Sequence, residues 1–210
     1  MWYNQLWDNE LKNSCSVLAF LDFLKYEYYI DVSRDSIVVL LNWLEKAMVF
    51  SRLWWAAAGK VYPAIQRYIR WKYDLEMRIE VWNINQINDG KWHLIAYKWA
   101  NKLYLSFTAD KVVTRKEIDK MKATNWHFVY YENWVVADNL GGILIKWSYE
   151  DIIYAYEKGL FYYNTRRFSA GDDKTQAVLE KAKAIWQARE KNKFERPFIS
   201  PQELKNLWII

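Results

Sequence analysis

The chain has 210 residues, of which 52% are hydrophobic and 19% aromatic, so it has enough apolar side chain for a folded core and is not disordered. It contains no run of 18 or more uncharged apolar residues, and its first residues lack the pattern of a cleaved signal. We therefore expect no membrane contact and no secretion by a cleaved signal, and a location in the cytoplasm or inside a larger particle. Of the formal net charge of +5, residues 164–210 carry +4, with ten Lys and Arg against six Asp and Glu. Because these charges are interspersed, they favour a solvated helix face over a nucleic-acid site.

The first third of the chain is predicted to be helical. Asn13 and Ser14 are good N-cap residues, and apolar residues follow at helical spacing over residues 15–28. A second capped segment predicts a helix from residue 35 to about 50, and Pro63, a residue typical of helix starts, predicts a shorter third helix. The chain's only cysteine follows Ser14, so it should lie in the first turn of a buried helix.

The hydrophobic period then changes to alternation, which predicts a sheet of short strands joined by turns. The expected strands cover residues 77–81, 92–97, 103–107, 126–131, 135–137, 143–147 and 160–163. Two capping sequences, at residues 114–117 and 148–151, predict short helices, and Gly159 is expected to end the second. Residues 132–134 are expected to form the turn of a β-hairpin.

Three parts are expected along the chain. Residues 1–163 form one domain, residues 164–171 read as a linker, and residues 172–210 form a helical C-terminal extension. In the extension, a helix is predicted to about residue 193, and a capping box at Ser200 starts a short apolar helix that docks on its own domain or on a protein partner. The predicted fold class is α+β, with helices first, an antiparallel sheet next and the helical extension last.

Cys15 is a candidate nucleophile because of its place at a helix start. The unpaired N–H groups and the positive end of the helix dipole favour a thiolate there. The alternative is that Cys15 is an inert packing residue, since free cysteine is among the most buried residue types.

His127 is the candidate base. It opens one strand of the predicted hairpin, and Asp138 and Asn139 close the other strand. Antiparallel pairing returns the end of the second strand beside the start of the first, so we expect Asp138 or Asn139 to reach the imidazole ring. An imidazole held through one nitrogen can accept the thiol proton with the other.

Three segments resemble motifs of the papain-like cysteine peptidases. The family's Gly-Ser-Cys-x-x-x-Ala segment is similar to residues 13–19, its His-x-Val strand to His127-Phe128-Val129, and its Asn-Ser-Trp-Gly segment to residues 139–142. Residues 148–161 also resemble the bacteriocin-processing branch, in which His-Phe-Val is followed by an Asp and a short helix. The likeness covers about residues 5–163.

The resemblance implies a papain-like fold and a thiol peptidase or related amide hydrolase. Cys15 would attack the carbonyl group of a peptide or protein substrate, and His127 would act first as base and then as acid. The third residue aligns with Asn139 on the papain branch and with Asp138 on the bacteriocin-processing branch. No metal or organic cofactor is implied, and one cysteine with two histidines does not make a closed zinc site of the usual kind.

Two positions in this comparison have rival assignments. The family carries a Gln six residues before the cysteine as an oxyanion donor, where this chain has Asn9, and Gln5 lies ten residues before it. His93 is the alternative base because its surroundings repeat those of His127, but the strand expected to follow it offers no Asn or Asp before Asp110, so we expect it to lack an orienting partner.

A second function class is an inactive papain-like fold that serves as a structural or interaction module of a larger assembly, such as a virus particle. Asn9 in the Gln position and the basic, apolar-ended tail suit that interpretation. A third interpretation is a nucleic-acid binder that uses this tail and exposed aromatic side chains.

The tryptophan content raises a separate hypothesis. The chain has 14 Trp and 6 Gly, and Trp134 follows Asn133 at the predicted hairpin tip, where a primed turn needs a positive φ. We hypothesise that the source reads as Gly a codon that this translation renders as Trp.

Overall fold

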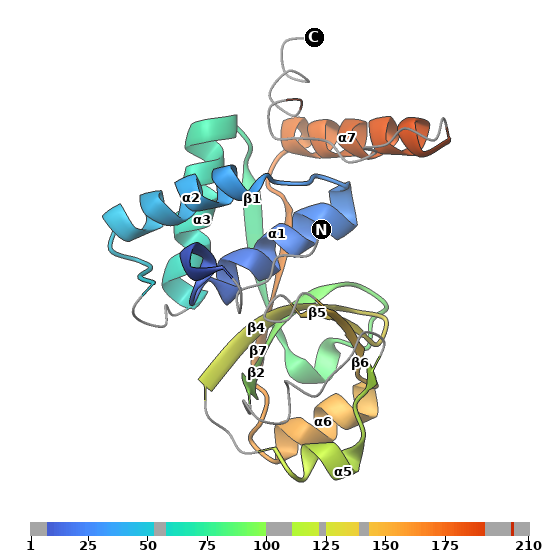
Figure 1. Ribbon diagram of the computed structural model, residues 1–210. Coiled ribbons are helices and arrows are strands. Elements are labelled where there is room, and N and C mark those ends of the chain that lie inside the picture. The colour runs from blue at the N-terminus through green and yellow to red at the C-terminus, as the bar shows by residue number, and fades with distance from the viewer. Residues whose placement is uncertain are drawn as a thin grey trace. The chain divides into compact units, whose positions relative to one another are not determined.

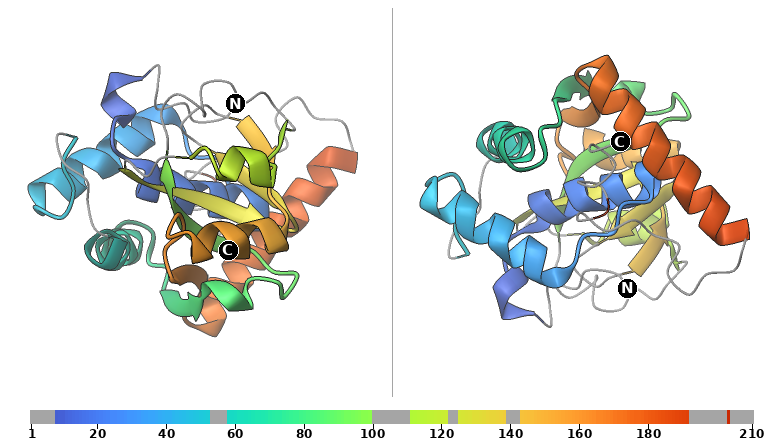
Figure 2. Two further views of the ribbon diagram at one scale, coloured as in Figure 1. Left: turned by 90° about the horizontal axis from the view of Figure 1, so that it is seen from below. Right: turned by 90° about the horizontal axis from the view of Figure 1, so that it is seen from above.

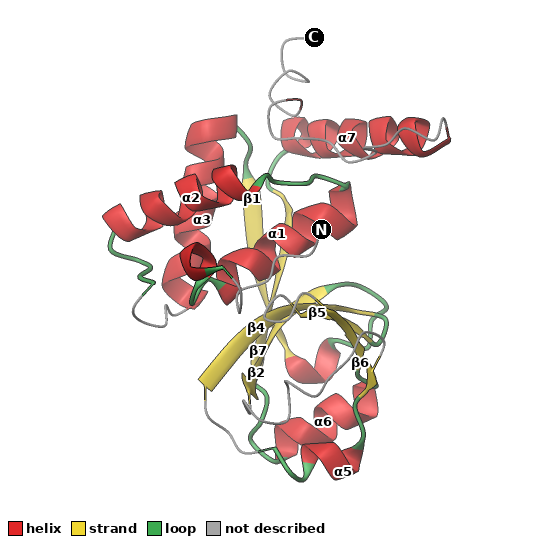
Figure 3. Ribbon diagram, viewed as in Figure 1, coloured by secondary structure: helices red, strands yellow, loops and turns green. Residues whose placement is uncertain are grey.

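The computed structural model describes residues 8–52, 58–99, 111–121, 125–138, 143–191 and 203. These residues belong to two compact units, one made of residues 1–20 and 80–167 and the other of residues 21–79 and 168–210. The architecture is α+β, with helices first, then a mostly antiparallel sheet, then a C-terminal helix (Figure 1 and Figure 3). This confirms the predicted α+β class and the order of its parts.

The first two N-terminal helices begin where their capping residues predict, whereas the end of the second and the start of the third differ from expectation. The helices are α1 (Cys15–Tyr28), α2 (Arg34–Lys46) and α3 (Ala58–Tyr73). Helix α2 ends before the expected residue 50, and Met48 just beyond it has a φ of 54°. Pro63 does not start α3 but lies inside it. The helix extends backwards from Pro63 through buried Val61 and Tyr62, at the cost of the bond that a proline cannot donate.

Helices α2 and α3 lie side by side within the second unit (Figure 1 and Figure 2). The Trp43 and Tyr68 rings meet between them with centroids 5.3 Å apart. Ile37, Leu41 and Leu44 of α2 are buried at helical spacing, so one face of the helix packs into the core. The C-terminal helix α7 (Asp173–Lys191) confirms the helix expected from residue 172. None of the helices in the described ranges combines the length and apolarity needed to cross a bilayer.

The described strands form one sheet in the order β1-β7-β2-β4-β5-β6-β3. Their bounds are β1 (Met77–Asn83), β2 (His93–Trp99), β3 (Lys111–Val112), β4 (Asn125–Glu132), β5 (Val135–Asp138), β6 (Ile143–Lys146) and β7 (Asn164–Ala170). Strand β2 pairs antiparallel with β4 over its whole length and places Tyr97 opposite His127. Strands β4, β5 and β6 continue the antiparallel pairing, and β3 pairs parallel with β6.

The segment expected to be a linker is strand β7, and the strand expected at residues 160–163 is reduced to a bridge between Phe161 and Tyr97. The run Asn164-Thr165-Arg166-Arg167 lacks hydrophobic alternation, yet two of its polar side chains have partners near or in the sheet. Thr165 contacts His93 of β2, and Arg167 pairs with Asp89 in the loop before β2. Long-range pairing therefore decides its conformation. The predicted strand at 103–107 and the start of the terminal helix at Ser200 lie outside the described residues.

The hairpin between β4 and β5 is confirmed, but its turn has two residues, Asn133 and Trp134, in place of the expected 132–134. Both have positive φ, 46° and 70°. This is the backbone of a primed turn, for which Asn-Gly is the favoured sequence. A tryptophan in the second position is strained, because its Cβ crowds the backbone at positive φ. Trp134 is 56% exposed, so burial does not offset that strain.

The two short helices of the first unit are confirmed with their caps. Helix α5 (Arg115–Ile118) follows Thr114, whose N–H and hydroxyl both donate to Glu117, and α6 (Tyr149–Glu157) follows Ser148, whose hydroxyl caps the Asp151 N–H at 3.1 Å. Gly159 ends α6 with a φ of 71°, and its N–H donates to the carbonyl of Tyr156.

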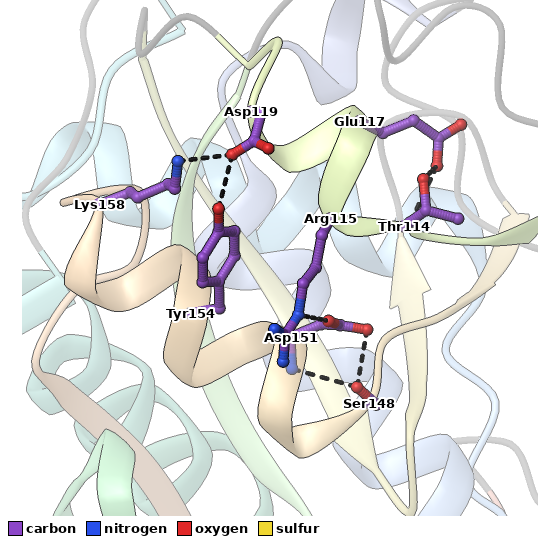
Figure 4. Close-up of polar contacts among 8 residues, drawn as sticks. All are labelled: Thr114, Arg115, Glu117, Asp119, Ser148, Asp151, Tyr154 and Lys158. Atoms are coloured by element: carbon purple, nitrogen blue, oxygen red, sulfur yellow. Dashed lines mark hydrogen bonds and ion pairs between the residues drawn. The ribbon is translucent and has the colours of Figure 1, made fainter.

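A polar cluster joins α5 and its C-terminal turn to α6 (Figure 4). Asp119 accepts hydrogen bonds from the Tyr154 hydroxyl and the Lys158 ammonium, and Arg115 pairs with Asp151 at 3.2 Å. The Arg115 and Lys158 cations also lie 5.0 and 4.7 Å from the centre of the Tyr154 ring. Beneath this cluster, Ile152 and Ala155 of α6 pack into a core shared with alternate residues of the sheet, among them Ile95, Tyr97, Val129, Tyr131, Val136 and Ile145.

Candidate active site

Cys15 is the first residue of α1, as the sequence predicts. The preceding turn is tightly held: Asn13 has a φ of 59°, the Ser14 hydroxyl donates to the Leu11 carbonyl at 2.5 Å, and the Ser14 carbonyl accepts from the Leu18 N–H at 2.9 Å. The thiol is 2% exposed. It therefore lies at the positive end of the helix dipole, where negative charge is stabilised.

His127 lies in β4, is 1% exposed, and contacts both Cys15 and Asp138. Its Nε2 is 2.9 Å from Asp138 Oδ1, and its ring is hydrogen-bonded to the Cys15 side chain. Since Nε2 faces the carboxylate, Nδ1 is the nitrogen available to the thiol. The predicted trio of thiol, imidazole and carboxylate is thus assembled inside the first unit.

The hairpin explains how Asp138 reaches His127. Tyr130 stands opposite Ala137, so Asp138 stands opposite Val129, two residues along the same sheet face from His127. Such a diagonal pair is about 7–8 Å apart at the backbone, within reach of these side chains. Asp138 is fully buried, so its charge requires partners. Asn139, the other candidate orienting residue, lies outside the described residues.

The charges of the site favour the imidazolium form of His127. Burial lowers the pKa of His127, but the Asp138 carboxylate and the Cys15 side chain outweigh it and raise the pKa from 6.5 to about 10. At neutral pH the ring is therefore protonated and donates through one nitrogen to Asp138. Its other nitrogen is directed to the Cys15 side chain.

Tyr97 is a residue of this site that the sequence did not indicate. It stands opposite His127 in the β2–β4 register, its ring meets the His127 ring edge to face at 5.6 Å, and its hydroxyl donates to Asp138 Oδ2 at 2.5 Å. The strand that contains Tyr97 was predicted from the sequence. Nothing local to the strand showed that β4 is its neighbour.

The structure describes one of the two candidate oxyanion residues. Asn9 starts the short 3-10 helix η1 (Asn9–Leu11) and is exposed, and within the described ranges no hydrogen bond joins its side chain to the site. Gln5 lies outside the described residues. The described groups nearest to Cys15 that suit an oxyanion are the backbone N–H groups at the start of α1.

The expectation that His93 lacks an acidic partner is wrong. Its Nε2 is 3.0 Å from Asp89 Oδ1, in the loop before β2, and its Nδ1 is 3.3 Å from the Thr165 hydroxyl. Arg167 also pairs with Asp89, at 3.5 Å. Burial lowers the pKa of His93, although the Asp89 hydrogen bond opposes this. Both ring nitrogens thus face groups other than the thiol, which makes His93 a buried structural residue.

Among the described residues, no group of three or more His, Cys, Asp or Glu side chains is arranged to hold a metal ion. No protein-family model matches the chain, and neither a curated protein nor a solved structure does.

Proposed function

We propose that this chain is a papain-like cysteine peptidase or a related amide hydrolase, with Cys15 as nucleophile and His127 as base. The observation that carries the proposal is the series of hydrogen bonds from Cys15 through His127 to Asp138. A thiol, an imidazole and an orienting carboxylate in this order are the side chains that thiol hydrolases use. The succession of helices and antiparallel sheet supports the same family.

The chemistry follows from the geometry. His127 takes the proton of the Cys15 thiol, and the thiolate sulfur forms a bond to the carbonyl carbon of a peptide or amide, whose π electrons move to the oxygen. The imidazolium then protonates the leaving amine as the C–N bond breaks, which leaves a thioester. Water, deprotonated by His127, attacks the thioester, releases the acid and returns the thiol. Asp138 holds the ring in one orientation throughout.

The backbone N–H groups at the start of α1 are the proposed main-chain donors to the oxyanion, since they point toward the helix end that carries Cys15. Asn9 or Gln5 is the proposed side-chain donor. The substrate class is a peptide or protein, and the reaction consumes only water.

The test is a thiol-labelling experiment on the whole protein. Cys15 is the only cysteine, so alkylation by iodoacetamide reports on it alone. We expect Cys15 to react at pH 6.5 faster than free cysteine, and His127→Ala to slow this reaction at least about tenfold, because the thiolate loses its imidazolium partner. His93→Ala is the matched control and should leave the rate near that of the wild type. The proposal is rejected if Cys15 reacts no faster than free cysteine and Cys15→Ala changes no cleavage of a mixed peptide library.

Burial of the site favours a second candidate, a papain-like fold without activity that serves as an interaction module. Cys15, His127 and Asp138 are each at most 2% exposed, whereas a nucleophile must reach a substrate carbonyl. For such a module, alkylation of Cys15 should be slow and equal in the wild type and in His127→Ala.

A further inference from the structure

Tyr97 contacts two members of the proposed trio, His127 and Asp138. Its hydroxyl donates to Oδ2 of Asp138, while Oδ1 of the same carboxylate faces Nε2 of His127. The two carboxylate oxygens of Asp138, in β5, thus bind two different donors, from the neighbouring strands β2 and β4. A carboxylate held at both oxygens cannot rotate without losing one of these bonds.

The hydroxyl of Tyr97 is fixed by packing. The side chain is buried, with the Phe161 ring 5.6 Å and the Trp147 ring 6.0 Å from its own ring, and its backbone forms a bridge with Phe161. Its ring also meets His127 edge to face. The position of the hydroxyl therefore does not depend on the state of the substrate or of the thiol.

We propose that Tyr97 is a positioning residue of this site: its hydroxyl fixes the Asp138 carboxylate and takes up part of its charge, so that His127 can release the proton it accepts from Cys15. This inference rests on the proposed function, in which His127 gives up a proton to the leaving amine in every cycle. In the part of the chain that the structure describes, Cys15 from α1, Asp138 from β5 and Tyr97 from β2 face His127.

The direction of the effect follows from the cost of a buried carboxylate. When the imidazolium loses its proton, Asp138 remains charged in a buried site, and the Tyr97 hydroxyl is then a charge-assisted donor to it. Without that hydroxyl, the state in which His127 is neutral and Asp138 is charged is less stable than it is with Tyr97 present. His127 would hold its proton to higher pH and return it less readily.

The test measures the protonation of His127 directly. The chain has two histidines, so ring NMR signals from labelled histidine are few, and a His93→Gln variant assigns them. Cys15→Ala serves as the background, because it removes the thiol that also acts on His127. In this background we expect Tyr97→Phe to raise the titration midpoint of His127 by at least about 0.5 pH unit, roughly a threefold gain in proton affinity.

Tyr131→Phe is the matched control. Tyr131 is a buried tyrosine on the same sheet face, it lies opposite His93, and it is hydrogen-bonded to the Trp134 backbone. A midpoint for His127 that is unchanged or lowered by Tyr97→Phe overturns the inference, as does an equal rise in Tyr131→Phe.

If Tyr97→Phe does not fold, 3-fluorotyrosine incorporated at position 97 replaces it. This more acidic donor should lower the midpoint, and no change would overturn the inference. Because this titration needs no activity, its failure is separate from a failure of Cys15 to react.

Discussion

Replacing Asp138 with Asn removes the charge that holds His127 protonated and keeps an oxygen that accepts a hydrogen bond. The rise in the pKa of His127 from 6.5 to about 10 corresponds to about 5 kcal/mol in favour of the imidazolium, at 1.36 kcal/mol per pH unit. Burial lowers the pKa of His127, and Asp138 is the largest of the causes that raise it. In Asp138→Asn, burial continues to lower the pKa of His127, and the charge that raised this pKa most is absent. We therefore expect the midpoint of His127 to fall by more than about 2 pH units, to below about 8.

Histidine NMR titration measures this midpoint, and Asp89→Asn is a matched control, because Asp89 is the carboxylate bonded to the other histidine, His93. That variant should change the His93 signal and leave His127 unaltered. A midpoint for His127 that stays above about 9 in Asp138→Asn would refute the reasoning, since it would mean that the carboxylate is not what keeps the ring charged.

The pair of His127 and Asp138 also predicts how the stability of the fold depends on pH. A pKa raised in the folded state contributes stability that is complete below pH 6.5, the value in the unfolded chain, and that is lost as pH rises toward about 10. With Cys15→Ala in both chains to remove the thiol, the chain that keeps Asp138 should exceed the Asp138→Asn variant in unfolding free energy. This excess should be greatest near pH 6 and shrink by pH 9. Urea unfolding at several pH values measures the difference.

Two further predictions concern the backbone. Trp134→Gly should raise the unfolding free energy by about 1 kcal/mol, because the residue has a φ of 70° in a primed turn and its side chain is exposed, and a lower urea midpoint would contradict this. The mass of the peptide across this turn, in protein made by the source organism, shows directly whether Gly stands there. Gly171→Ala should lower the unfolding free energy by about 1–3 kcal/mol. The Gly171 N–H donates to the Glu76 carbonyl oxygen at 2.6 Å, and an added Cβ would lie 3.0 Å from that oxygen. Gly59→Ala, with nothing within 4 Å of its Cβ, is the matched control and should be neutral or stabilising by up to about 1 kcal/mol in the same assay.

The sequence was sufficient for those features that depend on neighbours along the chain. Capping residues placed the starts of α1, α5 and α6, and the Asn133-Trp134 turn placed β4 and β5 in a hairpin. Because a two-residue turn also fixes register, the contact between His127 and Asp138 could be predicted from a short segment. Cys15 at a helix start is a local feature of the same kind.

The tertiary structure alone decided the contacts between segments that are distant in the sequence. The pairing of β2 with β4 brought Tyr97 to His127, the incorporation of a polar segment as β7 gave His93 its Thr165 partner, and chain folding brought Cys15 to an imidazole 112 residues away. Helical and strand periodicity specify which face of an element is buried but not which element covers it. That choice depends on the packing of the whole unit, which is why Cys15 and His127 could each be singled out from the sequence, whereas their contact was expected only from the resemblance to a family.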